Sequence, residues 1–241
     1  MTVLLEICID SIQSAMAAKT GGADRLEVCS SLALGGTTPS YGLVKQCVAD
    51  LQAPVMMMIR PHDGGFVYSD NDLDTMLNDI EIAKSIGVQG VVFGALNEDR
   101  TINVAQCRRL VEAAAGMETT FHRAFDIVPD PLAAVRQLQE FGVSRILTSG
   151  QAATAPQGSN LIRELASSQS EVAILAGAGV RPANVAQLLT QTGVREVHSS
   201  ASASCQDAQK SEHIQFGETR TTVDVDIVRA LKDTIRNWEV N

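Results

Sequence analysis

The chain has 241 residues, of which 45% are hydrophobic, and it carries a formal net charge of -9. This length and apolar content are sufficient for one large core, and the acidic balance disfavours binding to nucleic-acid phosphates or to anionic membrane surfaces. Aromatic residues make up only 4% of the chain and no dense Lys/Arg run accompanies them, so we expect no nucleic-acid partner.

The start of the chain and its cysteines indicate a cellular compartment. A strand-like apolar segment at 3–9 reaches Asp10 before any long apolar run forms, so we expect no secretory signal and no membrane span. Five widely spaced cysteines include no Cys-x-x-Cys pair; they are Cys8, Cys29, Cys47, Cys107 and Cys205. An odd number of such cysteines favours a reduced chain in the cytoplasm.

Strand-like segments alternate with amphipathic helical segments along the chain. We expect strands at 3–9, 24–29, 55–60, 90–94, 118–122, 144–149, 172–177 and 195–200. We expect helices to begin at Asp10 or Ser11, Asp70 or Asn71, Asn103, Asp130 and Arg181, and to end at Gly21-Gly22, Gly87, Gly116, Gly142 and Gly193. Eight such alternations predict an α/β fold, a single-domain TIM-type (β/α)8 barrel over 1–241. Residues 201–222 lack periodicity and could form a lid or a flexible loop, before a closing helix at 223–239.

An internal repeat supports the barrel and assigns its faces. Gly22, Gly87, Gly142 and Gly193 each end a helix, and a small apolar residue follows before the second, fourth, sixth and eighth strands. Side chains alternate along a strand, so an alignment of these four strands shows which residues face the barrel interior at the same height. These residues are Glu27, Val92, Leu147 and His198. The same parity points Cys29, Gly94, Ser149 and Ser200 inward in the next layer, and Glu6, Cys8, Met58, Arg60, Thr120 and His122 inward from the odd strands.

Charged side chains at these inward positions need an explanation, because charges are rarely buried without a partner. One interpretation is a closed salt-bridge network, in which Arg25 and Arg60 compensate Glu6 and Glu27. The other is a site at the barrel mouth for acid/base chemistry or anion recognition. The two interpretations are compatible with each other.

The stretch 119–126 brings an imidazole, a guanidinium and a carboxylate to one strand end, before Pro129 and Pro131. An ion pair of His122 or Arg123 with Asp126 would explain it structurally. In the enzyme hypothesis, the catalytic candidates are His122, Glu27, Asp126 and Glu6, with His122 as general acid/base oriented by Asp126 or Glu27. The candidates for binding a small anionic or phosphorylated substrate are Arg25, Arg60, Arg123, Ser149, Gly177, Gly179, His198 and Ser199.

The glycine pair Gly177 and Gly179 follows the seventh strand and leads toward a helix. Barrels often hold a phosphate with the loops after strands seven and eight, so this loop could form an anion cradle with Ser149 and Ser199. A tight turn alone would equally explain the two glycines.

Several segments together resemble the CutC family, which is associated with copper homeostasis. They are 22–29, 35–40, 59–61, 120–126, 147–150 and the loop with Gly177 and Gly179. The resemblance implies a TIM-type barrel, a cytoplasmic location, a homodimer and a role in copper homeostasis. His62 departs from the family pattern, which usually repeats an arginine there, and the chain beyond 200 matches poorly.

The copper link of the family falls on Cys8 and Cys29, which the face assignment places inward on neighbouring strands. Two thiolates can hold Cu(I), and no organic cofactor is indicated. Against a metal site, Glu6 and Glu27 would oppose thiolate formation, and a buried cysteine is also an ordinary core residue. Copper homeostasis through Cu(I) binding and an enzyme acting on a small anion are therefore the two functional hypotheses.

Overall fold

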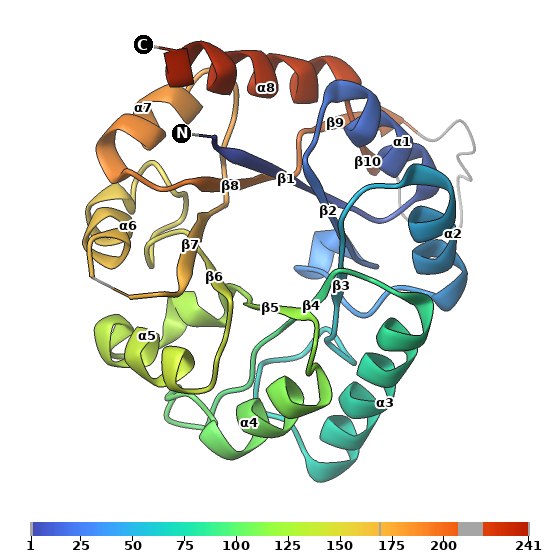
Figure 1. Ribbon diagram of the computed structural model, residues 1–241, viewed down its shortest axis with the longest axis vertical. Coiled ribbons are helices and arrows are strands. Elements are labelled where there is room, and N and C mark those ends of the chain that lie inside the picture. The colour runs from blue at the N-terminus through green and yellow to red at the C-terminus, as the bar shows by residue number, and fades with distance from the viewer. Residues whose placement is uncertain (1, 169, 207–218, 241) are drawn as a thin grey trace, which may run out of the picture.

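The computed structural model describes residues 2–168, 170–206 and 219–240. Eight parallel strands pair in chain order and close into a barrel, with β8 returning to β1, and helices surround the barrel (Figure 1). The strands are β1 Leu4–Ile9, β2 Arg25–Val28, β3 Val55–Met58, β4 Gly90–Phe93, β5 Glu118–Phe121, β6 Arg145–Thr148, β7 Ala173–Ala176 and β8 Glu196–Ser199. The (β/α)8 barrel expected from the sequence is confirmed.

The helices are α1 Ile12–Gly21, α2 Tyr41–Leu51, α3 Asp70–Ile86, α4 Val104–Ala113, α5 Pro131–Glu140, α6 Ser159–Ala166, α7 Val185–Thr192 and α8 Val225–Val240. Five of the helices, α1 to α5, begin where a short polar side chain accepts from a first-turn backbone N–H group. Ser11 caps α1 as expected. The cap of α3 is Ser69, not Asp70 or Asn71, because Ser69 and Asp72 form a reciprocal capping box. The helix expected from Arg181 begins only at Val185.

Two separate apolar clusters stabilise the barrel. The larger lies between the strands and the helices and takes in Leu26 and Val28 of β2, the neighbours of Glu27, which agrees with the inward direction predicted for Glu27. The smaller lies inside the barrel and consists of Cys29, Met56, Met58 and Val92. One part of the barrel interior is therefore apolar, and the charged side chains occupy the rest.

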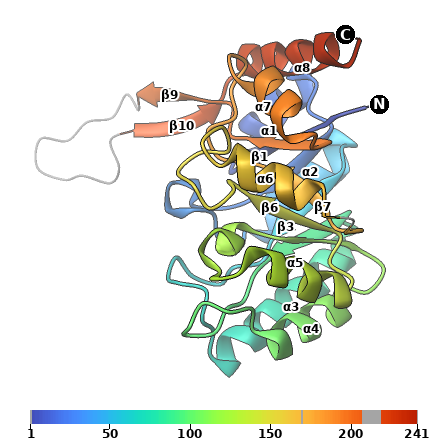
Figure 2. The same cartoon turned by 90° about the vertical axis from the view of Figure 1, so that its left-hand side faces the viewer.

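The last helix, α8, joins the two ends of the chain. Lys232 Nζ lies 2.7 Å from Asp24 Oδ1, and the other oxygen of Asp24 accepts a hydrogen bond from Leu5 N at 2.8 Å. Glu239 accepts a hydrogen bond from the backbone N–H of Val3. The N- and C-termini consequently lie side by side (Figure 1, Figure 2).

A two-stranded antiparallel ribbon stands in the region expected to be a lid or a loop. Its strands are β9 Ser202–Gln206 and β10 Thr219–Val223, and they project away from the barrel (Figure 2). Both strands consist mainly of Ser, Thr and other small or polar residues without a strongly hydrophobic face, which is why the sequence pattern did not indicate them. Residues 207–218, the rest of the expected lid, lie outside the described residues. Among the helices that are described, none is long and apolar enough to cross a membrane.

Candidate functional site

Near the amino ends of the strands, five charged side chains form a network of ion pairs in the barrel interior. Arg25 donates hydrogen bonds to Glu6 and, at 2.6 Å, to Glu196. Arg145 also lies 3.1 Å from Glu196 and forms a second ion pair with Glu118. We call Glu6, Arg25, Glu118, Arg145 and Glu196 the closed network. It bears out the structural interpretation for Glu6 and Arg25, whereas Arg60 forms no ion pair within it.

Closer to the carboxyl ends of the strands, Cys8 of β1 lies near Glu27 of β2 and His198 of β8. The register pairs Cys8 with Glu27 of β2 and pairs Glu6 with His198 of β8. One donor atom from each of Cys8, Glu27 and His198 lies within 4.8 Å of the other two, and all three residues are buried. A thiol, a carboxyl and an imidazole so arranged could hold a metal ion.

Hydrogen bonds and charges fix the protonation of this group. His198 Nδ1 lies 2.7 Å from Glu6 Oε1, and His198 Nε2 lies 3.9 Å from Glu27 Oε2. Burial lowers the pKa of His198, but Cys8, Glu27 and the bond to Glu6 outweigh it and raise that pKa well above its usual value. Burial also raises the pKa of Glu6, yet His198 and Arg25 overcome this and lower it to about 2. Glu6 is thus a carboxylate that holds His198 as an imidazolium.

Cys29 lies next to this group rather than opposite Cys8. Its Sγ donates to Glu27 Oε2 at 3.4 Å, and the β1–β2 register places Glu27, not Cys29, at the height of Cys8. Burial raises the pKa of the Cys29 thiol, and the nearby charges of Glu27 and Cys8 raise it further. Before any metal binds, Cys29 is therefore a thiol bonded to a carboxyl group.

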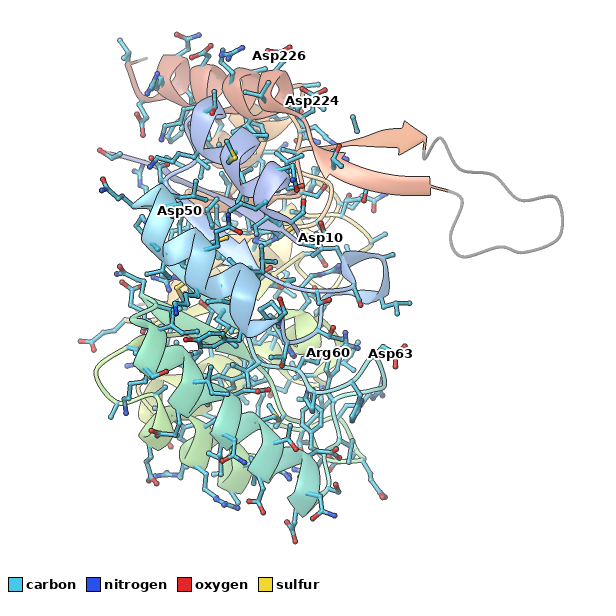
Figure 3. All side chains as sticks on the ribbon, turned by 90° about the vertical axis from the view of Figure 1, so that its right-hand side faces the viewer. Asp10, Asp50, Arg60, Asp63, Asp224 and Asp226 are labelled. Carbon is cyan, nitrogen blue, oxygen red and sulfur yellow. The ribbon has the colours of Figure 1, made fainter. Side chains whose placement is uncertain are left out.

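A cavity of about 390 Å³ opens at the carboxyl ends of the strands. Seven of the predicted site residues line it: Cys8, Glu27, Arg60, His122, Arg123, Asp126 and His198. Figure 3 shows Arg60 on the side of the barrel from which the β9–β10 ribbon projects. Glu6, Arg25, Cys29, Ser149, Gly177, Gly179 and Ser199 are not part of the lining.

His122 lies between β5 and the short 3-10 helix Arg123–Ile127, as the N-cap of that helix. Its Nδ1 accepts a hydrogen bond from Ala124 N at 3.2 Å, so the other ring nitrogen, Nε2, carries the hydrogen of the neutral ring. Burial, and then the charge of Arg60, lower the pKa of His122 to about 3. This geometry provides a fixed hydrogen-bond donor at neutral pH, whereas the sequence indicated a general acid/base.

Asp126 contacts the end of β6 and the loop after it, and not the ring of His122, which we expected either Asp126 or Glu27 to orient. Its carboxylate accepts hydrogen bonds from Thr148 Oγ1 at 2.5 Å and from Ser149 Oγ at 2.9 Å. It also pairs with Arg123 at 2.8 Å, and Arg123 reaches Ser149 Oγ at 3.1 Å. These contacts bear out the strand-end ion pair for Arg123 and join two loops at the rim of the cavity.

The expected anion cradle uses its polar groups internally. Ser199 Oγ donates to Val180 O at 2.8 Å and accepts from Ala201 N at 3.0 Å. A Cβ at Gly177 would lie 2.6 Å from Leu147, and one at Gly179 would lie 2.8 Å from Thr154. The two glycines therefore allow close packing of the loops over strands β6 to β8.

From the sequence, we predicted Cys8 and Cys29 as metal ligands, Glu27 as a catalytic residue and His198 as a substrate-binding residue. The signal that could have joined His198 to Cys8 was barrel closure, because β8 of a closed barrel must lie beside β1. Phe66 was not singled out at all. Its ring lies 4.9 Å from the ring of His122 and 5.2 Å from the guanidinium of Arg60.

Comparison with known proteins places this barrel among relatives with the same architecture. A family model described as CutC family matches residues 3–203. The family protein CutC of Vibrio vulnificus is 51% identical over 203 residues, which cover 83% of this chain and 81% of that protein. The copper homeostasis protein cutC homolog of Homo sapiens is 43% identical over 199 residues, covering 82% of this chain and 73% of that protein.

A solved structure supports the same grouping. It is that of a protein from Streptococcus agalactiae assigned as the copper homeostasis protein CutC, with a TM-score of 0.79 and 31% identity. The match covers 83% of this chain and 99% of that one. By sequence and by fold, the chain belongs to the CutC family.

Proposed function

We propose that this protein serves copper homeostasis by binding one Cu(I) ion at the barrel mouth, through Cys8 and His198 with Cys29 or Glu27 beside them. The observation that carries the proposal is the group formed by Cys8, Glu27 and His198, whose donor atoms lie within 4.8 Å of one another. The group is buried but lines a cavity, so an ion could reach it. The copper homeostasis names of the relatives are in keeping with it.

The donor set favours a soft ion. Thiolate sulfur and imidazole nitrogen suit Cu(I), whereas a lone carboxylate suits harder ions. Glu27 therefore fits better as the group that positions the Cys29 thiol and accepts its proton than as the main ligand. Metal binding at these ligands requires His198 to give up its imidazolium proton and the thiol ligands to give up theirs. Glu27, whose pKa is raised by burial, can accept one of these protons, and the others can leave to solvent through the cavity.

The state of the cysteines agrees with a reducing compartment. Cys8, Cys29, Cys47 and Cys107 are all free thiols. Reduced thiols are the rule in the cytoplasm, which we propose as the location. The proposal includes a homodimer, as the family resemblance implies, and light scattering in solution tests that part.

An anaerobic titration of Cu(I) against a competing coloured chelator tests the site. We expect Cys8→Ser and His198→Gln to weaken Cu(I) binding about tenfold or more, because each removes a soft or borderline ligand. Cys47→Ser and Cys107→Ser are the matched controls, because these buried thiols belong to helices α2 and α4. Their affinity should equal that of the parent.

The double variant Cys8→Ser/Cys29→Ser decides the proposal. If it binds Cu(I) as tightly as the parent, the mouth is not the copper site. If His198→Gln alone keeps full affinity while the double variant loses it, the ion is held by the two cysteines without the imidazole.

A further inference from the structure

Arg60 is a buried cation whose charge is not balanced by a carboxylate. It is 5% exposed. Nη1 donates to Leu34 O and Gly36 O, both at 2.9 Å, and Nη2 donates to Gly64 O at 2.7 Å. These carbonyls orient the guanidinium without cancelling its charge, and no carboxylate of the described residues pairs with it. An unpaired buried charge is costly, which points to a missing negative partner.

Arg60 also retains donors for such a partner. A guanidinium has five N–H groups, and the three bonds to carbonyls leave Nε–H and one Nη2–H. Nε is buried and has no partner among the described residues. Arginine commonly binds carboxylates through two neighbouring N–H groups.

His122 supplies a second unused donor in the same cavity. It is 4% exposed, and its Nε2 is buried without a partner in the described part of the chain. Since Nδ1 accepts from Ala124 N, Nε2–H is the free end of the ring. A Cβ at Gly94 would lie 2.5 Å from this ring, so glycine at that position makes room for it.

Apart from the Tyr68 hydroxyl beside Arg60, apolar side chains contact the two donors. Phe66 contacts both the His122 ring and the Arg60 guanidinium. Met58 and Leu147 line the same cavity, whose volume is about 390 Å³. A pocket of this kind, apolar with a few polar groups, is typical of sites for small organic molecules.

We propose that the mouth cavity binds a small organic carboxylate, whose head group lies between Arg60 and His122 and whose apolar body lies against Phe66, Met58 and Leu147. A single carboxylate charge matches the single unbalanced cation. A phosphate would need further donors, and the Ser199 hydroxyl at the end of β8 is already bonded to Val180 O and Ala201 N. This ligand site uses other residues than the proposed copper ligands, although both sets line the same cavity, and it goes beyond the copper function.

Copper-free protein tests the proposal directly, so its outcome does not depend on copper binding. The probes are phenylacetate, its neutral isostere phenylacetamide, and inorganic phosphate, each titrated by calorimetry and by ligand-observed NMR. We expect phenylacetate to bind about tenfold more tightly than either of the other two, since only it offers one carboxylate on an apolar body.

Variants identify the head-group site. Arg60→Met should weaken phenylacetate binding about tenfold or more, and Arg109→Met, an exposed arginine on α4, is the control for loss of charge. Arg60 also donates hydrogen bonds to three loop carbonyls, so its replacement could disturb the loops. A second pair of variants, at His122, leaves these hydrogen bonds in place. His122→Asn keeps an acceptor near Ala124 N but lacks a donor at the Nε2 position, whereas His122→Gln restores one. We expect weaker binding in the first and near-parent binding in the second.

Three results would overturn the proposal. The first is the absence of phenylacetate binding up to about 10 mM, a concentration at which even a weak specific site would be occupied. The second is equal affinity for the acid and the amide, which would show that Arg60 does not recognise charge. The third is equal binding by the Asn and Gln variants at position 122.

Discussion

The closed network and the mouth bury charge in opposite ways inside one barrel. In the closed network, Arg25 and Arg145 each meet two carboxylates. At the mouth, Arg60 bonds to carbonyl oxygens and lies beside the Tyr68 hydroxyl without meeting a carboxylate, and the Nε2 of His122 meets none of the described polar groups. Removing one partner of a buried ion pair is strongly destabilising, whereas a buried charge without a partner is typical of a functional site. The closed network therefore has a structural role in the barrel, whereas the mouth has buried polar groups that are available to bind a ligand.

The largest effect should come from breaking the closed network. Arg25→Met leaves Glu6 and Glu196 short of a partner in the barrel interior, and we expect a loss of about 3–5 kcal/mol in the free energy of unfolding. Urea denaturation measures it. Arg229→Met, which breaks an exposed pair with Asp226, is the control and should cost under about 1 kcal/mol. Equal losses in the two variants would contradict a structural role for the network.

Acid should reveal the contribution of Glu6. Its pKa is about 2 in the folded protein against 4.5 for the ordinary group, so the unfolded chain takes up the proton first as the pH falls. The stabilisation is complete above pH 4.5 and is lost between pH 4.5 and 2. Over that range the parent should lose on the order of 3 kcal/mol more than Glu6→Gln. Parallel stability curves would show that Glu6 is not held as a carboxylate.

The protonation of His122 should affect the free energy of unfolding at a higher pH than that of Glu6. The pKa of His122 is lowered from 6.5 to about 3 in the folded protein. Between these two pH values, the ring is protonated in the unfolded chain and neutral in the folded protein. The parent therefore loses stability below pH 6.5, by about 1.4 kcal/mol per pH unit more than His122→Gln. Denaturation at pH 6 and pH 5 tests this. A steeper slope in the variant would mean that the ring is charged in the folded protein.

The rim of the mouth should contribute least. Arg123 is 46% exposed, and its pair with Asp126 is open to solvent screening. Arg123→Met should change the free energy of unfolding by less than about 1 kcal/mol, measured by thermal and urea denaturation. A loss as large as that of Arg25→Met would show that the rim is part of the framework, which would weaken the contrast between the two regions.

Much of the architecture could be predicted from short-range patterns. The alternation of strands and helices gave the barrel, and side-chain parity placed Glu27, His122 and His198 inside it, where all three line the cavity. These features depend on neighbouring residues along the chain. The sequence therefore carries them locally.

The features that could not be predicted depend on register or on side-chain direction. The pairing of Cys8 with Glu27 rather than Cys29 is set by the stagger of the closed barrel. Which nitrogen of His122 bonds to Ala124 is set by the turn after β5. Asp126 forms the ion pair with Arg123 that was considered, but its further bonds to Thr148 and Ser149 at the end of β6 depend on how the two strand ends lie in space.

The contacts of α8 have a consequence for how the chain can be cut and rejoined. Glu239 bonds to Val3 and Lys232 bonds to Asp24, so the entry and exit of the chain meet at the end of the barrel opposite the cavity. Neighbouring termini make a circular permutation feasible, because a short linker can join them. The linker and any fusion there would leave the mouth open, so new ends can be chosen around the ring of βα units without blocking access to it.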